Sequence, residues 1–248
     1  MDESSYVYIF QKGFNYSQDG PGNRLVYHLA GCNLTCPWCS NPEGMAINHD
    51  SQRVSINHIV AEALSSRMIF IDGGGVTLTG GEVTCQKNSA LLLLKKLKEN
   101  GIHTCIETNA SITHCEEIFD TVDYMIADFK SPSAERLKDV TDASLEVIKN
   151  NLIYRAKTGN PLLVRIPLIK YFNCSETDAR GFAQFFRELN DYGNGNVFFE
   201  ILTYHEFGKE KYAKLNKEYT VTDGYVTDND VKTLLQELKA QSLKTINT

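Results

Sequence analysis

The sequence Gly31-Cys32-Asn33-Leu34-Thr35-Cys36-Pro37-Trp38-Cys39-Ser40-Asn41-Pro42 sets three thiols at C-x3-C-x2-C spacing within one short stretch. No fourth cysteine follows nearby. A four-iron cluster that is held by only three thiolates keeps one iron open to an outside ligand. A closed zinc site, the weaker alternative, takes four protein ligands in paired knuckles, and only Cys36 and Cys39 form such a pair. The loop therefore predicts one [4Fe-4S] cluster with Cys32, Cys36 and Cys39 as its metal ligands.

The loop and its surroundings resemble the radical S-adenosylmethionine (SAM) enzymes, in which the residue before the last cysteine is usually aromatic, as Trp38 is here. Two flanking runs resemble one branch of them, the activating enzymes of glycyl radical enzymes: Asp19-Gly20-Pro21-Gly22-Asn23-Arg24 and Cys39-Ser40-Asn41-Pro42-Glu43. That branch usually has an aliphatic residue where Asn23 stands. The resemblance implies that Trp38 and Asn41 lie at the cofactor and that Asp19, Gly20 and Asn23 face the substrate. We expect the Asp19–Gly22 turn near the rim where cluster and cofactor converge.

Composition limits the class of protein. The chain has 248 residues, 42% of them hydrophobic, which is enough for one sizeable core, so we expect a single domain over residues 1–248. The net charge is −6 and the cations are scattered, which argues against nucleic-acid binding. The longest apolar runs are far shorter than a membrane span. The first five residues, Met1 to Ser5, do not form a leader. We therefore expect a cytoplasmic protein, and a monomer.

The remaining cysteines do not form a second site. Cys85, Cys105, Cys115 and Cys174 stand apart in segments that read as strand or helix, so we expect buried, unpaired thiols and no disulfide framework. Many relatives of the activase branch carry a ferredoxin-like insertion after the cysteine loop. Here only residues 43–55 separate that loop from the next helix, so we expect no insertion and no auxiliary cluster.

Strand and helix patterns alternate along the chain, which predicts a parallel sheet covered by helices. The expected strands are 24–30, 75–79, 102–108, 123–129, 161–167 and 195–203. The expected helices are 56–68, 88–100, 112–122, 133–158 with a break near Thr141, 175–189, 206–219 and 228–241. Ser55 is the expected N-cap of the first helix, and Gly101 marks the end of the second. Six β/α units are too few for a closed barrel, so we predict an α/β fold of the partial (β/α)6 barrel type.

Polar motifs stand at the carboxyl ends of the expected strands, where active sites of such sheets lie. Thr79-Gly80-Gly81-Glu82 follows the second strand, and its glycines allow the backbone to approach a ligand closely. By itself this motif is more often a turn. After a cysteine loop it resembles the radical SAM motif that binds the methionine amino group, although Val83 replaces the usual Pro.

Two pairs of polar residues end the next strands. Glu107 and Thr108 end the third, and Asp128 and Lys130 follow the fourth. A carboxylate buried at such a place needs a cation or hydrogen-bond donors, although solvated loop acids are the alternative. The resemblance implies that Glu107 reads the SAM ribose and that the acid pair with Thr108 holds a monovalent cation in some members. Ala110 replaces the usual Gly of the family.

Two more residues are candidates for SAM binding. Arg165 is a charge inside the apolar strand Leu163-Val164-Arg165-Ile166-Pro167, and a buried guanidinium favours a carboxylate partner. That partner is either the SAM carboxylate or an acid of a structural salt bridge. His205 lies in Tyr204-His205-Glu206-Phe207-Gly208-Lys209, which is similar to an activase motif, and the resemblance implies that it contacts the nucleoside of SAM.

The resemblance implies that reduced cluster and SAM generate a 5′-deoxyadenosyl radical, which removes hydrogen from a glycine of a partner glycyl radical enzyme under anaerobic conditions. With no auxiliary cluster, a flavodoxin or ferredoxin supplies the electron. Two alternatives stay open. One is a radical SAM enzyme that modifies a small molecule or a ribosomal peptide, with Asn23 adapted to it. The other is an iron–sulfur redox sensor without catalysis.

Overall fold

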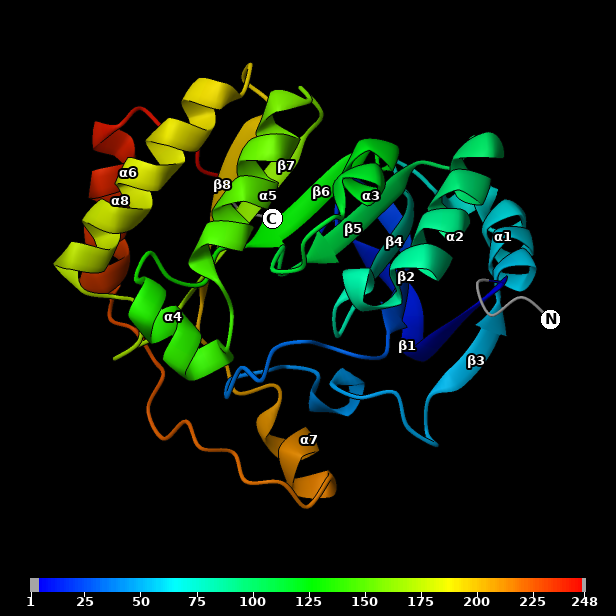
Figure 1. Cartoon of the computed structure of the whole chain (residues 1–248), viewed down its shortest axis with the longest axis horizontal. Helices are drawn as coiled ribbons and strands as arrows, with labels where there is room; N and C mark the ends of the chain where they lie inside the picture. The colour runs from blue at the N-terminus through cyan, green and yellow to red at the C-terminus, as the bar shows by residue number, and fades with distance from the viewer. Residues whose placement is uncertain (1–4, 247–248) are drawn as a thin grey trace. The chain divides into compact units, whose positions relative to one another are not determined.

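The computed structural model describes residues 5–246, so Met1 to Ser4 of the N-terminal segment lie outside the described residues. The chain forms two compact units (Figure 1). The first contains residues up to 33, residues 41–108 and residues 114–126, and the second contains residues 34–40, 109–113 and those from 127 onward. The single domain expected from chain length stays a prediction.

The strands of both units belong to one open, mostly parallel sheet, in the order β3-β1-β2-β4-β5-β6-β7-β8. Their bounds are β1 Tyr6–Tyr16, β2 Asn23–Leu29, β3 Gln52–Ser55, β4 Gly75–Gly80, β5 Thr104–Thr108, β6 Tyr124–Asp128, β7 Leu162–Leu168 and β8 Val197–Thr203. All six predicted strands are present, as β2 and β4 to β8. This confirms the α/β class and the partial barrel type of fold. The antiparallel strands β1 and β3 were not predicted.

The helices follow the predicted order, and several differ in length from their predictions. They are α1 Ile56–Ser65, α2 Lys87–Glu99, α3 Glu116–Thr121, α4 Ala134–Thr141, α5 Leu145–Lys157, α6 Glu176–Tyr192, α7 Lys209–Lys214 and α8 Asp228–Ala240. The expected helix 112–122 is only α3, and 206–219 is only α7. A 3-10 turn, Arg67–Ile69, replaces the end of the helix expected over 56–68. The predicted break lies at Asp142, whose backbone is left-handed with φ of 65°.

In the first unit, α1, α2 and α3 lie along one side of the strands (Figure 1). Helix α1 begins where predicted, because the Ser55 side chain accepts a hydrogen bond from the backbone of His58. Helix α2 ends where predicted, at Asn100, followed by Gly101 with φ of 67°. The apolar face of α1 is buried through Ile56, Ile59 and Ala63, which is how an amphipathic helix covers a sheet.

The opposite side of the first unit's strands is polar. Side chains two residues apart on a strand point the same way, so Thr77 and Thr79 of β4 share one side with Arg24 of β2 and Glu107 of β5, to which they bond. Cys105 lies on that side too, two residues before Glu107. We call this side, defined by Arg24, Thr77, Thr79, Cys105 and Glu107, the polar face.

The core of the second unit is aromatic. Phe129 packs against three phenylalanines of α6, and Phe186 of that helix stacks on Phe199 of β8 at 4.5 Å between ring centroids. Helix α6 begins at a capping box in which Ser175 and Asp178 exchange hydrogen bonds with each other's backbone. Such a cap fixes where the helix starts.

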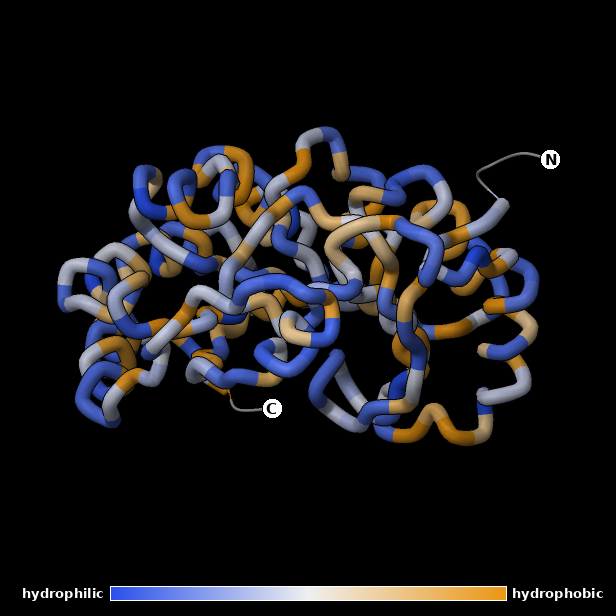
Figure 2. The backbone as a smooth tube through the Cα atoms, turned by 90° about the horizontal axis from the view of Figure 1, so that it is seen from below, coloured by the Kyte–Doolittle hydropathy of each residue, from blue (hydrophilic) through white to orange (hydrophobic). Residues whose placement is uncertain are grey.

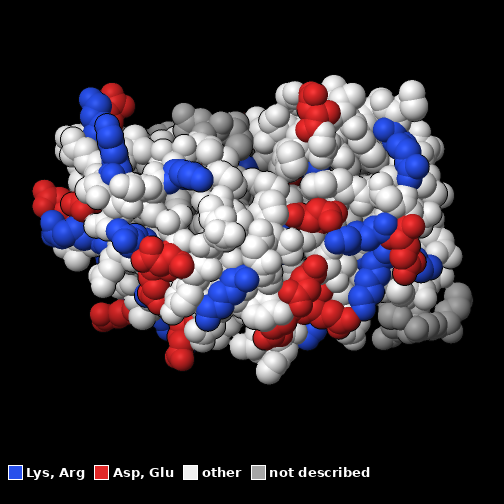
Figure 3. Space-filling model, turned by 90° about the horizontal axis from the view of Figure 1, so that it is seen from above, with Lys and Arg blue, Asp and Glu red and all other residues white. Residues whose placement is uncertain are grey.

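On the face drawn in Figure 3, basic and acidic side chains are interspersed. Short apolar and polar stretches alternate along the described chain (Figure 2). Among the helices of residues 5–246, none is long and apolar enough to cross a membrane.

Candidate active site

The first part of the cysteine loop, up to Asn33, belongs to the first unit. Gly31 has φ of 96°, a conformation that favours glycine. Its N–H donates to Gly44 O at 2.8 Å, and the N–H of Cys32 donates to Met45 O at 3.0 Å. These two bonds anchor Cys32 directly after β2, where the sequence predicted the cluster loop to start.

The Gly-Gly-Glu motif packs against this anchor. The N–H of Glu82 donates to Gly31 O at 2.7 Å. A Cβ on Gly81 would lie 2.3 Å from that same oxygen, so only glycine fits there. A Cβ on Gly80, whose φ is 125°, would lie equally close to the backbone of Leu29. The first unit thus brings Gly80, Gly81 and Glu82 beside Cys32, two parts of the predicted site that stand about fifty residues apart in sequence.

Hydrogen bonds join the next predicted residues to this motif. Thr79 donates to Glu107 Oε2 at 2.7 Å across β4 and β5, on the polar face. Thr108 donates to Glu82 Oε1 at 2.7 Å, and the Thr84 hydroxyl donates to that same oxygen at 2.6 Å. Glu82 is 1% exposed, so these donors stabilise a buried carboxylate. Four predicted residues, Thr79, Glu82, Glu107 and Thr108, are therefore brought together.

The rest of the cysteine loop belongs to the second unit. The N–H of Cys39 donates to Cys36 O at 3.1 Å, which closes a turn between the two thiols. Tyr212 of α7 donates to that same oxygen at 3.2 Å. A Cβ on Gly208 would lie 2.0 Å from Cys39 O, so the glycine of the Tyr204–Lys209 motif allows α7 to pack on the loop. Burial raises the pKa of the Cys36 thiol to about 11, although Lys130 opposes the shift.

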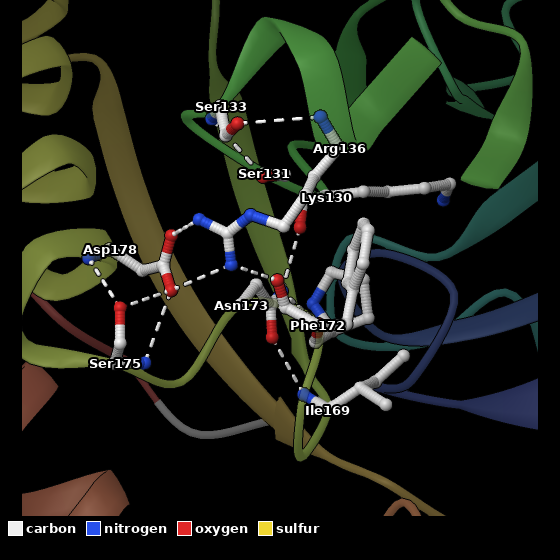
Figure 4. A network of polar contacts seen from close by, with 10 residues as sticks. Lys130, Ser131, Ser133, Arg136, Ile169, Phe172, Asn173, Ser175 and Asp178 are labelled. Atoms are coloured by element: carbon white, nitrogen blue, oxygen red, sulfur yellow. Dashed lines mark hydrogen bonds and ion pairs between the residues drawn. The ribbon is translucent and has the colours of Figure 1, made fainter. Parts of the chain in front are cut away.

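Trp38 packs on the ring of Phe172, with 4.6 Å between centroids. Phe172 lies in the loop between β7 and α6, which side chains from other elements hold in place (Figure 4). Arg136 of α4 donates to Phe172 O at 2.5 Å and pairs with the buried Asp178 of α6. Phe172 was not predicted as a neighbour of Trp38, because the two residues lie far apart in sequence.

Lys130 is tied to the same loop. Its side chain donates to Asp128 Oδ2 at 2.6 Å, so the two residues of this predicted pair contact each other. The Asn173 amide donates to Lys130 O at 2.6 Å and to Pro167 O at 2.8 Å, while its oxygen accepts from the N–H of Ile169 (Figure 4). Asn173 therefore links the end of β6 to the end of β7.

Arg165 has a protein partner. Its Nε donates to Glu200 Oε2 of β8 at 2.7 Å, and both side chains are nearly buried. This is the salt bridge that the sequence left open as an alternative. Glu200 was missed, although it interrupts the apolar run of β8 just as Arg165 interrupts that of β7.

His205 follows the end of β8, as predicted. Its ring stacks on Phe207 with 4.0 Å between centroids. Burial lowers the pKa of His205. The imidazole is therefore neutral at pH 7, a state in which one ring nitrogen donates and the other accepts.

The Asp19–Gly22 turn joins β1 to β2, so it lies at the amino end of β2. Gly31 follows the carboxyl end of that strand, which is seven residues long. The turn folds back onto the polar face, where Thr77 donates to Asp19 O at 2.7 Å and Gly20 packs against Cys105 and Arg24. Its expected place near the rim where cluster and cofactor converge stays a prediction.

Arg24 of β2 binds this turn, a contact that was not predicted. It is 0% exposed. Its guanidinium donates to Thr77 Oγ1 at 2.5 Å and to the carbonyl oxygens of Pro21 and Val76 at 3.0 and 2.8 Å. Thr77 lies two residues before Thr79 on the same strand, so the turn occupies the row of side chains about 7 Å below the Thr79 and Glu107 row.

Asn23, predicted to face the substrate, bonds within the first unit. Its side-chain amide donates to Ile69 O at 2.8 Å, and its N–H donates to Ile71 O at 3.1 Å. An aliphatic residue at this position could not make the first bond. The substrate role of Asn23 stays a prediction, whereas its structural role accounts for the departure from the family pattern.

The model of the radical SAM superfamily matches residues 26–183, from β2 into α6. The chain belongs to the radical SAM superfamily. Within it, the chain is 30% identical over 221 residues to the pyruvate formate-lyase-activating enzyme of Staphylococcus aureus strain USA300, covering 86% of both chains, and equally to that of strain NCTC 8325. This likeness places the chain in the family of these activating enzymes.

Solved structures show the same radical SAM fold. A domain of the pyruvate-formate lyase-activating enzyme from Bacteroides vulgatus matches with a TM-score of 0.57 at 22% identity, covering 70% of this chain and 98% of that one. SuiB of Streptococcus suis, bound to its precursor peptide, matches with a TM-score of 0.66 at 16% identity, covering 90% of this chain and 48% of SuiB.

Radical SAM proteins use a [4Fe-4S] cluster and SAM, and the residues present fit both groups. Cys32, Cys36 and Cys39 are reduced thiols on one loop, the donor type that such clusters take. Across residues 5–246, no three His, Cys, Asp or Glu side chains are gathered into a ready-made metal site, so the fit of the cluster rests on the thiols and their spacing. For SAM, Gly80 and Gly81 at the end of β4 are both partly exposed and carry no side chain, so a ligand can approach their backbone.

Proposed function

We propose that this radical SAM enzyme installs a glycyl radical on a partner glycyl radical enzyme, as the name of its pyruvate formate-lyase-activating relatives indicates for them. Bound cluster and SAM supply a 5′-deoxyadenosyl radical, which abstracts one hydrogen atom from a glycine Cα. The observation that carries the proposal is the packing of Gly81 and Glu82 against Gly31 within the first unit. It puts the candidate methionine-binding motif next to the first cluster cysteine.

The chain's own residues then have distinct proposed tasks. Cys32, Cys36 and Cys39 hold the cluster, while Gly80, Gly81 and Glu82 bind the methionine amino group through backbone and carboxylate. Glu107 orients the ribose, held by its bond from Thr79, and Arg165 and His205 bind the carboxylate and the nucleoside. Trp38, Asn41, Thr108, Asp128 and Lys130 complete the cofactor site, with a monovalent cation at the acids. The Asp19–Gly22 turn receives the glycine segment of the partner from the amino end of the strands.

We further propose an external flavodoxin or ferredoxin as electron donor, a monomeric state and a cytoplasmic location. The donor follows from the presence of a single three-thiol loop in the sequence. The small-molecule alternative rested on the presence of Asn23. The hydrogen bond from its side-chain amide to Ile69 O offers a structural reason for an asparagine at this position instead. The alternative of a peptide-modifying enzyme is supported only by the similarity of the fold to that of SuiB.

The test is to mix the anaerobically reconstituted, reduced enzyme and SAM with the co-encoded glycyl radical protein, and separately with peptides that span its glycine loop. We expect a doublet glycyl signal in electron paramagnetic resonance and one methionine released per radical formed. The Asp19→Ala variant should lose the signal but keep its iron. SAM cleavage that responds to a metabolite and never to protein or peptide would sink the proposal.

A further inference from the structure

Five large apolar side chains of the first unit are exposed at the amino end of β2. Phe14 and Tyr16, at the end of β1, are 49% and 54% exposed, and Met68, Ile69 and Ile71, in the segment before β4, are 91%, 43% and 54% exposed. We call these five residues the apolar patch. Exposed apolar side chains that gather at one place mark interaction sites more often than singly scattered ones do.

Hydrogen bonds join the two segments that carry the patch. Tyr16 lies opposite Asn23 in the β1–β2 pairing, and its hydroxyl donates to Asp72 Oδ2 at 2.8 Å. Asn23 bonds the carbonyl oxygens of Ile69 and Ile71, as described above. The two segments are therefore fastened to each other at the end of the hairpin, which keeps their exposed apolar side chains in one region of the surface.

The patch also adjoins the Asp19–Gly22 turn. A Cβ on Gly22 would lie 2.2 Å from Ile71 O and 2.6 Å from Asp72 O, so the turn and the patch segment are in direct contact. The N–H of Ser17 donates to Gly22 O at 2.9 Å and closes the same hairpin. The turn that is assigned to the glycine segment of the partner thus continues directly into the apolar patch.

We propose that the apolar patch is the docking surface for the folded body of the glycyl radical enzyme, beside the turn that receives its glycine segment. This inference rests on the proposed function. Protein interfaces combine an apolar centre with a polar edge, and here Asp19 and Asp72 provide that edge. A lipid surface requires basic residues beside the apolar ones, whereas Asp19 and Asp72 are acidic and Arg24, which also bonds into this hairpin, is fully buried.

The test compares Met68→Glu, Ile71→Glu and the double variant with a control, Leu235→Glu. Leu235 lies on α8 of the second unit and is 39% exposed, so the control adds the same charge away from the patch. Because the replaced side chains point to solvent, the variants should fold, and the milder Met68→Gln gives a graded comparison. Each is assayed for affinity to the co-encoded glycyl radical protein and for SAM cleavage driven by a short glycine-loop peptide.

We expect the double variant to bind the full-length protein at least ten-fold more weakly, while peptide-driven SAM cleavage and iron content stay within two-fold of wild type. The control should match wild type in every assay. Unchanged affinity of the double variant, or an equal loss with protein and peptide, would overturn the docking surface while leaving the proposed function intact. Variants that lose only self-association, or only binding to anionic vesicles, would overturn it too. A wild-type enzyme that acts on neither protein nor peptide refutes the proposed function, and the docking surface with it.

Discussion

The Arg165 guanidinium and the Glu200 carboxylate meet between two strands at a site that is nearly closed to solvent. Breaking such a pair from one side leaves a buried charge and costs about 3–5 kcal/mol. A ligand carboxylate at Arg165 would meet a guanidinium that Glu200 already orients. The same pair can therefore serve both the fold and the cofactor.

Replacing Arg165 by Ala should consequently have two effects. The free energy of unfolding should fall by roughly 3 kcal/mol, and SAM affinity should fall about ten- to a hundred-fold because a charged hydrogen-bond donor is lost. Urea unfolding and equilibrium dialysis measure these separately. The control is Glu200→Gln, which should lower stability but keep most of the SAM affinity. Unchanged SAM affinity in Arg165→Ala would remove that residue from the cofactor site.

The cysteines also permit a prediction at the level of single residues. Anaerobic reconstitution should give about four irons per chain, because one three-thiol loop exists. Cys32→Ala, Cys36→Ala and Cys39→Ala should each abolish the cluster absorbance, whereas Cys85→Ala and Cys174→Ala should keep it. Iron analysis and visible absorption measure the outcome. About eight irons per chain, or intact clusters in the loop variants, would contradict the assignment.

At the scale of elements, the segment after β5 carries a strained residue. Ala110 has φ of 54°, a left-handed conformation that costs a non-glycine residue roughly 1–2 kcal/mol. The Asn151 amide, which donates to Ala110 O at 2.8 Å, helps to hold it there. Related activating enzymes usually have glycine at this position, and the positive φ is the physical reason for that choice.

We therefore expect Ala110→Gly to be more stable than wild type by up to about 1 kcal/mol, because the relief of strain exceeds the added entropy of the unfolded chain. Urea unfolding measures the difference. Ala110→Val should be less stable than wild type, since β-branching makes the same conformation harder to adopt. A glycine variant that is less stable than wild type would show that the alanine methyl group contributes packing that outweighs the strain.

How far the sequence predicted the elements depends on the strength of the local pattern. The six parallel strands are short apolar runs between turn residues, and all were found. The strand β1 was missed, although Tyr6 to Phe10 is a β-favouring run and the Asp19-Gly20 turn after it is typical of a hairpin. Helix α7 is far shorter than predicted because its length depends on packing against the cysteine loop, through Gly208 and Tyr212. A local sequence pattern does not reveal such a contact between distant segments.

At the scale of the whole molecule, the site motifs were found in the correct order along the strands, because the spacing of cysteines and strand-end polar residues is visible in sequence. Partners far apart in sequence were not found. Glu200, Phe172 and the contact of Arg24 with the Asp19–Gly22 turn depend on which strands become neighbours. That this turn closes a hairpin with β2 was also not predicted, because strand β1 was unknown.

Acid should destabilise the chain through carboxylates that are bonded in the folded state. Burial alone would raise the pKa of Asp123, but hydrogen bonds from Thr104 and Lys98 outweigh it and lower the pKa. The pKa of Glu62 is lowered in the same way, by Lys12 and Tyr27. Because each folded pKa lies below the unfolded one, about 4, the stabilisation is present above that pH and lost as pH falls through the folded values.

We therefore expect the free energy of unfolding of the metal-free chain to decrease steadily as pH falls below about 4. Urea titrations at several pH values measure it. Asp123→Asn should start from lower stability at pH 7 and show a shallower decline. A variant whose pH dependence equals that of wild type would exclude Asp123 as a contributor.

The two hydroxyl groups of β4 on the polar face have a consequence for how this protein can change over evolution. Thr77 holds the turn and Thr79 bonds Glu107, and both point the same way only because one residue lies between them. Inserting or deleting a single residue there would turn one of the two hydroxyls toward the helices. Lineages of this enzyme should therefore tolerate length variation in loops such as 46–51, while the spacing between these two positions stays even.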